Sequence, residues 1–457
     1  MTKKQILTLS ITTSTSFATS FSGSAMNLAI PSLSSYFHMG AASVGWITTA
    51  YMLVIAAVSV PFGKIADNTS RRNMLIGGVA VFGAASVAGT FAWSAATILF
   101  IRAVQGIGAA MLFASNVPIA VSAFPPQQRG KAIGIVSTGV YFGLAIGPAL
   151  GGFLNNTFSW KAIFYFGAFI AFSSMILAII FLDKDRVDNK GAKLDLGGNV
   201  VYMFMLACII YGLTGLNSVR FSWAVLVFGI LLGVLFTYIE LKSEDPVIDV
   251  RIFANDRVFT LSNLTALLNY SATFSLGYFV SIYLQVAQGL NSSEAGLIMI
   301  TQPIVMALLS ARTGNLSDKV PAYKLASAGM GVCAAALLFF VFAQVNTPIV
   351  VVIMALIVAG IGIALFSAPN TNVVMGCVPP SQYAVANAVL STMRTTGQTT
   401  GMAIITIVVS ATIGNVSLYD VPPADLVSTM HIAFIIFTIL CIAGMFMSLA
   451  RRKTQAA

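Results

Sequence analysis

Residues 134–152 read GIVSTGVYFGLAIGPALGG, a stretch that contains no charged side chain. Gly143, Gly147 and Gly151 repeat at intervals of four and therefore lie along one face of a helix, which lets a neighbouring helix approach closely. Pro148 removes one backbone donor and permits a bend. The stretch predicts a membrane-spanning helix that packs tightly against a partner and can still flex.

Apolar stretches of this kind recur along the whole chain. Of its 457 residues, 58% are hydrophobic and only 8% are charged, far fewer charges than the surface of a soluble protein needs. Fourteen segments reach the roughly 20 mostly apolar residues of a spanning helix, near 6–30, 43–65, 74–93, 96–123, 131–154, 161–182, 197–216, 222–239, 258–287, 295–315, 324–344, 347–375, 383–412 and 429–450. We expect an all-α polytopic protein embedded in a lipid bilayer.

The positive charges predict the orientation of these helices. With the N-terminus in the cytoplasm, only Lys161 and Arg220 face outward, while Arg102 and Arg394 fall inside helices. The other 20 of the 24 basic residues lie on the cytoplasmic side: Lys3, Lys4, Lys64, Arg71, Arg72, Arg129, Lys131, Lys184, Arg186, Lys190, Lys193, Lys242, Arg251, Arg257, Arg312, Lys319, Lys324, Arg451, Arg452 and Lys453. This imbalance indicates a multi-pass protein of the cell membrane with both termini in the cytoplasm.

The chain also repeats itself. Gly63-Lys-Ile-Ala-Asp67 closes the second predicted helix, and Gly314-Asn-Leu-Ser-Asp318 closes the tenth. Both read as glycine, a spacer, an apolar residue, a small residue and an aspartate. We therefore expect two six-helix bundles, 1–182 and 257–457, with an inserted helix pair in 183–256. Internal repeats with a site at their interface are typical of transporters.

Three motifs give the chain a resemblance to the major facilitator superfamily. The segment from Gly63 to Arg72 resembles the loop signature of that family between helices 2 and 3: Gly63, Asp67, Arg71 and Arg72 match, and Asn68 and Ser70 depart. Arg102-Ala-Val-Gln105-Gly resembles its helix 4 motif. The set Gly134, Gly143, Gly147, Pro148, Gly151 and Gly152 matches the antiporter motif of its drug-exporting members in full.

Over its whole length the chain resembles the fourteen-helix drug:proton antiporter branch of this family. The resemblance implies a major facilitator fold, with two bundles around a central cavity, no cofactor, and a monomer that exchanges a small-molecule substrate for protons. It also implies that Gly63, Asp67, Arg71 and Arg72, with Asp318 of the repeat, latch the halves on the cytoplasmic face through charge pairs.

Polar side chains inside the predicted helices are the candidates for a substrate and proton pathway. Arg394 lies near mid-membrane with Gln398 one turn further on, and a charge at that depth is costly unless it serves a function. Arg102 is shallower, so snorkelling to the outer surface is the alternative interpretation. A buried amide alone more often links helices. The full set is Asn27, Arg102, Gln105, Asn116, Tyr270, Gln302, Asn370, Asn372, Arg394 and Gln398.

None of the 14 acidic residues lies in the middle of a predicted helix. In many members of the resembled branch an aspartate stands nine residues before the proline that ends helix 1, and here Pro31 places Ser22 in that position. The usual proton relay and a preference for cationic drugs are therefore both in doubt. A cavity of net positive charge suits an anionic, zwitterionic or neutral amphipathic compound.

Two transporter functions remain open: proton-driven export of small amphipathic compounds, as in multidrug efflux, and transport of a specific organic anion or metabolite held by Arg102 and Arg394. A membrane receptor or scaffold would not need duplicated halves. The sequence shows no nucleophile triad, metal-ligand cluster or phosphate loop, so we expect neither an enzyme nor a metal site. The basic residues are spread over short loops, so no nucleic-acid partner is expected.

The predicted topology can be tested by labelling single cysteines with a membrane-impermeant maleimide. Thr2→Cys, Lys190→Cys and Thr454→Cys should react only in inverted vesicles, because all three lie on the predicted cytoplasmic side. Ser218→Cys and Pro422→Cys should react in whole cells. The unmodified chain, whose four cysteines lie in apolar stretches, is the control, and labelling of Lys190→Cys from outside would refute the topology.

Overall fold

The computed structural model describes residues 1–125, 129–183, 196–215, 221–243, 250–317, 320–378, 383–414, 416–418 and 420–451. These residues are almost entirely helical, and the one β-contact among them is an isolated bridge between Gly40 and Ser417. The helices are α1 (Lys3–Tyr36), α2 (Ala41–Val44), α3 (Trp46–Asn68), α4 (Arg71–Thr90), α5 (Ala95–Ser122), α6 (Arg129–Thr157), α7 (Lys161–Phe181), α8 (Leu196–Gly215), α9 (Ser222–Lys242), α10 (Val250–Asn255), α11 (Arg257–Ile282), the π-helix η2 (Tyr283–Ala287), α12 (Ser292–Met299), α13 (Thr301–Leu316), α14 (Ala322–Val341), α15 (Ile349–Gly376), α16 (Tyr383–Thr412) and α17 (Pro423–Ala450).

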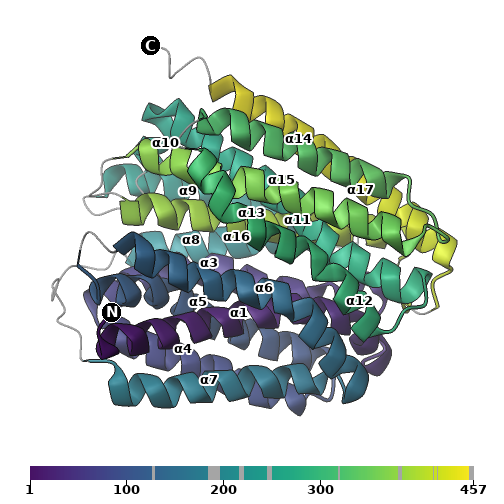
Figure 1. Ribbon diagram of the computed structural model, residues 1–457, viewed down its shortest axis with the longest axis horizontal. Coiled ribbons are helices and arrows are strands. Elements are labelled where there is room, and N and C mark those ends of the chain that lie inside the picture. The colour runs from purple at the N-terminus through teal and green to yellow at the C-terminus, as the bar shows by residue number, and fades with distance from the viewer. Residues whose placement is uncertain are drawn as a thin grey trace.

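The long helices run side by side in two bundles, and both chain ends lie on the same side (Figure 1). We call that side the terminal face, marked by Lys3 and Arg451, and the opposite side the distal face, marked by Tyr36 and Pro423. The first bundle consists of α1 and α3–α7, and the second of α11–α17. The helix pair α8 and α9 packs on α3 and α16. This arrangement confirms the predicted fold of two six-helix bundles with an inserted pair.

Nine helices of the described part of the chain are long and apolar enough to cross a membrane, and α1 and α11 are not among them. Both are rich in hydroxyl and amide side chains and are largely buried between other helices. Their hydroxyls bond to carbonyls of the preceding turn, as Thr12 does to Thr8 (3.0 Å) and Ser262 to Val258 (2.6 Å). Polar groups satisfied inside their own helix can lie in the membrane interior at little cost.

Proline did not end the first helix as expected, because α1 continues through Pro31 to Tyr36. Proline lacks the N–H that would bond to the carbonyl four residues earlier. Here the freed carbonyl of Asn27 accepts a hydrogen bond from the Ser281 hydroxyl at 2.9 Å. Pro148 frees the carbonyl of Leu144 in the same way, and the Ser24 hydroxyl donates to it at 3.2 Å. Each helix therefore continues because a neighbouring helix supplies the missing donor.

The glycines of α6 mark where two helices press against it. A Cβ atom at Gly143 would lie 2.7 Å from the Phe17 carbonyl oxygen, and one at Gly151 would lie 2.5 Å from the Cβ of Ala25, both on α1. On another side, a Cβ at Gly152 would lie 2.1 Å from the Ser292 carbonyl oxygen of α12. The helix α6 therefore sits between its own bundle and the other one, in contact with both (Figure 1).

The second bundle also has glycines that let two helices approach closely, which agrees with the duplication expected from the sequence. A Cβ atom at Gly397 or Gly401 of α16 would meet the carbonyl oxygen of Leu267 or Ser271 of α11 at 2.5 or 2.3 Å. The pair α16 and α11 thus repeats the close approach of α6 and α1. By contrast, a Cβ at Gly63 or Gly314, near the terminal face, would meet nothing within 4 Å.

These contacts predict that Gly152→Ala prevents close approach of the two bundles at the distal face. The new methyl group would overlap the Ser292 carbonyl, so α12 must move away from α6. Cross-linking of cysteines placed at Gly40 and Ser417, which form a β-bridge between the two bundles at the distal face, should fall in this variant. Gly376→Ala is the matched control, because a Cβ there meets nothing within 4 Å and cross-linking should be unchanged. Equal cross-linking in all three proteins would contradict the proposed contact.

Candidate functional site

Arg102 lies in the interior of the first bundle and is fully buried. Its Nη1 donates to Gln105 Oε1 (2.5 Å) and to Ser22 Oγ (3.1 Å), and its Nε donates to the Ile47 carbonyl (3.2 Å). The guanidinium carbon stands 4.2 Å from the centre of the Tyr51 ring. The snorkelling interpretation is therefore wrong, because neutral groups from α1, α3 and its own helix α5 hold this charge inside the protein.

The partner of Arg102 on α1 is the residue that departs from the resembled antiporters. Ser22 is 4% exposed and accepts a hydrogen bond from Arg102 where many of those proteins carry an aspartate. A serine satisfies the donor but does not neutralise the positive charge. Gln105 extends the network by donating to Ser86 at 2.8 Å. The first bundle thus contains a buried cation whose described partners are all uncharged.

Arg394 of α16 is the second embedded cation, about 17 Å along the helix from the terminal face at 1.5 Å per residue. Its guanidinium carbon lies 5.1 Å from the centre of the Tyr270 ring. Its Nε is buried and has no hydrogen-bond partner in the described structure, and the side chain as a whole remains partly exposed. The Tyr270 hydroxyl lies 3.2 Å from Ser367 Oγ.

The two arginines therefore differ in kind. Arg102 makes three hydrogen bonds inside its own bundle and leaves only Nη2 without a described partner, whereas Arg394 rests on the Tyr270 ring and its buried Nε has no described partner. Tyr141 of α6 lies within electrostatic range of Arg394, so the first bundle also faces this charge. A guanidinium with an unpartnered N–H group is suited to bind a planar anionic group through paired hydrogen bonds.

The predicted pathway amides occupy several separate environments. Asn116 is buried in the first bundle, accepts from Thr15 (2.8 Å) and donates to Ser16 (2.9 Å), so it links α5 to α1. Asn372 is exposed near the terminal face and donates to Ser317 (2.5 Å). Gln302 and Gln398 are partly exposed on α13 and α16. Of the predicted set, Arg394 is in contact with Tyr270, and Arg102 with Gln105.

Asn370 belongs to a cluster that the sequence did not reveal. It is 1% exposed, donates to the Ser262 carbonyl (3.2 Å) and accepts from Arg451 (2.9 Å). Arg451 is fully buried at the end of α17 and also donates to Ser262 Oγ (2.8 Å). Burial lowers the pKa of Arg451 to about 10, so the side chain stays charged at neutral pH. Together they fasten α17 to α11 and α15.

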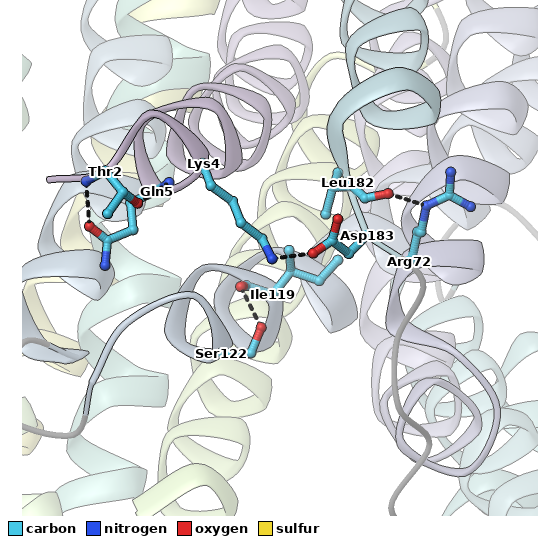
Figure 2. A network of polar contacts seen from close by, with 8 residues as sticks. All are labelled: Thr2, Lys4, Gln5, Arg72, Ile119, Ser122, Leu182 and Asp183. Carbon is cyan, nitrogen blue, oxygen red and sulfur yellow. Dashed lines mark hydrogen bonds and ion pairs between the residues drawn. The ribbon is translucent and has the colours of Figure 1, made fainter.

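The predicted latch is described only in part. The side chain of Asp67 and all of Asp318 lie outside the described residues. Arg72 donates to the carbonyl of Leu182 at 2.8 Å (Figure 2) and to the carbonyl of Ile179 at 2.9 Å, both at the end of α7, where a positive charge is favourable. Nearby, Lys4 pairs with Asp183 on the exposed surface. These contacts join α1, α4 and α7 within one bundle, and a role in gating for Gly63, Asp67, Arg71, Arg72 and Asp318 stays a prediction.

At the distal face the two bundles are joined directly. The Ala41 amide donates to the Val416 carbonyl at 2.6 Å, and Gly40 bridges to Ser417. A Cβ atom at Gly45 would lie 2.9 Å from Met402 of α16. The loop between α1 and α3 therefore closes against the loop between α16 and α17, far from the terminal face.

Two repeated helix bundles that meet around embedded polar groups are the architecture of a membrane transporter. Consistent with this, residues 12–244 and 263–457 match the Major Facilitator Superfamily. Because the match covers most of the chain, the protein belongs to this superfamily, and it is a transporter rather than an enzyme.

Three known proteins illustrate the relationship. The riboflavin transporter RibZ of Clostridioides difficile is 28% identical over 378 residues, 83% of this chain and 82% of RibZ. The multidrug resistance protein Stp of Mycobacterium tuberculosis is 26% identical over 421 residues, 90% of this chain and 77% of Stp. A bacterial homologue of the human lysosomal transporter Spinster, solved in an inward-facing, unoccupied conformation, shares the fold at 18% identity with a TM-score of 0.69, covering 99% of this chain and 98% of that structure.

The contrast between the arginines predicts different effects of one substitution. Arg102→Gln should lower the free energy of unfolding by about 1–3 kcal/mol for each acceptor that loses its donor. Arg394→Gln should change stability far less, because its Nε has no partner to lose. Thermal unfolding of the substrate-free proteins in one detergent measures both. An equal loss of stability in the two variants would show that Arg394 is also a structural residue.

Proposed function

We propose that this protein is a secondary transporter of the fourteen-helix branch that exports small amphipathic compounds by alternating access. The observation that carries the proposal is Arg394, a mid-membrane cation with unused hydrogen-bonding capacity and no carboxylate among its described neighbours. Such a residue is costly to keep and is a functional candidate by default. It favours neutral, zwitterionic or anionic substrates over cationic ones.

The contacts at the two faces support a state that is closed at the distal face and open at the terminal face, which is one of the two end states of alternating access. Direct contacts close the distal face, whereas a Cβ atom at Gly63 or Gly314, near the terminal face, would meet no described atom within 4 Å. If the terminal face is cytoplasmic, as the distribution of basic residues predicts, this state is inward-facing. A substrate would enter from the cytoplasm, bind near Arg394 and Tyr270, and leave once the bundles have rocked about α6 and α16.

Two substrate ranges fit this site. The relatedness to Stp, named for multidrug resistance, supports broad efflux and a contribution to antibiotic resistance. The second candidate, transport of one organic anion or metabolite, is favoured by the unpartnered N–H group of Arg394, and RibZ is named for a single vitamin. Competition distinguishes them, because a broad exporter is inhibited by many unrelated compounds and a specific carrier by close analogues only.

Proton coupling is supported by the glycine–proline pattern of α6, which matches that of drug-exporting members of the superfamily. We propose that a proton gradient drives export by a monomer in the cell membrane. The absence of a mid-helix carboxylate in the sequence makes this the part most in need of a direct test. Uptake into inverted vesicles should rise when the vesicle lumen is made acidic, because protons then leave as the substrate enters, and it should collapse with a protonophore.

Variants of Arg394 test the proposed substrate site. Arg394→Lys keeps the charge but loses the planar guanidinium with its paired N–H donors, and Arg394→Gln loses both. For an aromatic carboxylate that the wild-type protein binds, affinity should fall roughly tenfold in the lysine variant and at least a hundredfold in the glutamine variant, from lost charge-assisted bonds of about 1.5–3 kcal/mol each. Titration calorimetry on purified protein measures both.

A matched neutral ligand is the control for this experiment. The corresponding aromatic alcohol should bind the wild-type and glutamine variants with similar affinity, since it offers no charge to Arg394. Unchanged binding of the carboxylate to Arg394→Gln would discard the anion site and leave Arg394 as a brace for α16.

A further inference from the structure

Five buried polar residues form a continuous chain of hydrogen bonds that crosses between the two bundles just inside the distal face. From the first bundle come Asn27 of α1 and Asn155 of α6, and from the second come Ser281, Gln285 and Ser292. All five are less than one-tenth exposed. We call this set the distal lock.

The first side of the lock runs from α6 to α12. The Asn155 amide nitrogen donates to Ser292 Oγ at 2.8 Å, across the interface, and to Ser32 Oγ at 3.0 Å within its own bundle. The contact lies one turn from Gly152, where α6 and α12 approach most closely. The hydrogen bond therefore forms only while the bundles are pressed together at this face.

The second side returns through the π-helix. Ser292 Oγ donates to Gln285 Oε1 at 2.9 Å, and Gln285 Nε2 donates to Ser281 Oγ at 3.0 Å and to the Ser281 carbonyl at 3.2 Å. Gln285 is carried by η2, a single wide turn at the end of α11. Such turns are rare and occur often at functional sites. The position gives Gln285 contacts to both Ser281 and Ser292, so it joins α11 to α12.

Pro31 supplies the last link. Because proline cannot donate to it, the Asn27 carbonyl is free, and Ser281 Oγ donates to it across the interface at 2.9 Å. When the bundles separate at this face, water can replace Ser281 as the donor. The side-chain oxygens of Asn27 and Asn155 are buried without partners in the closed state and would also gain water.

We propose that the distal lock is the gate that holds the transporter closed at the distal face, with Gln285 as its central residue. The lock contains no ionisable side chain, so its strength does not depend on pH. Opening breaks the two hydrogen bonds that cross the interface, and the two unsatisfied oxygens then gain water, which keeps the closed and open states close in free energy. The inference rests on the alternating access proposed above and is independent of the substrate.

The experiment measures the separation of the bundles at the distal face by double electron–electron resonance between two spin labels. Spin labels are attached to cysteines replacing Phe158 and Phe342, both exposed, in a transport-competent chain without native cysteines. Gln285→Ala should raise the fraction of distally open molecules about tenfold, since Ser281 and Ser292, which make the bonds across the interface, then lose the side chain that orients them. Ser281→Ala, which removes a single hydroxyl, should raise it by a smaller factor and keeps the test valid if the first variant folds poorly.

Two amides serve as matched controls. Gln288, beside η2, donates to Tyr283 and Thr347 within the second bundle, and Asn116 bonds only within the first bundle among its described contacts. Gln288→Ala and Asn116→Ala should leave the distance distribution unchanged. If Gln285→Ala and Ser281→Ala match these controls while wild-type protein still opens under a proton gradient, the lock is overturned and alternating access stands. If no condition opens the wild-type distal face, alternating access itself fails.

Discussion

The hydrocarbon interior of a membrane offers no hydrogen-bond partner, so each polar group placed there must be satisfied by the protein. Most of this structure follows that constraint. Hydroxyls on α1 and α11 bond to their own helices, and carbonyls freed by Pro31 and Pro148 accept from neighbouring serines. Arg102 is surrounded by neutral donors and acceptors in the same way. Arg394 is the mid-membrane cation of α16 whose buried Nε lacks a described partner, and the proposed substrate site therefore centres on it.

Close backbone approach gives the same helices their capacity to move. Because α6 presents glycine to both α1 and α12, these helices approach it closely along those faces. The bundles meet through one continuous cluster of buried apolar side chains, to which Met26 of α1 and Phe279 of α11 belong. Short polar links, each worth about 0.5–1.5 kcal/mol net, add to this contact and can be broken and remade at a modest cost.

Features that follow from residue spacing or local composition could be predicted from the sequence. Features that depend on contacts between distant helices could not. Helix number, the inserted pair and the packing face of α6 follow from apolar length and glycine spacing. The partners of Arg102 come from helices distant in sequence, so its burial was indistinguishable from snorkelling. Arg451 was one basic residue among many near a chain end, and nothing local marks the π turn that carries Gln285. The broken tenth helix, α12 and α13, was also predicted as one.

The central claim is that this transporter selects substrates with an uncompensated arginine near mid-membrane and no acidic residue at that depth. Thermal stabilisation of the purified protein by size-matched aromatic compounds that differ only in charge tests it most directly, because a ligand stabilises the state that it binds. The account predicts that carboxylates stabilise most, neutral analogues less, and ammonium analogues not at all. Stabilisation by the ammonium compounds and not by the carboxylates would contradict it.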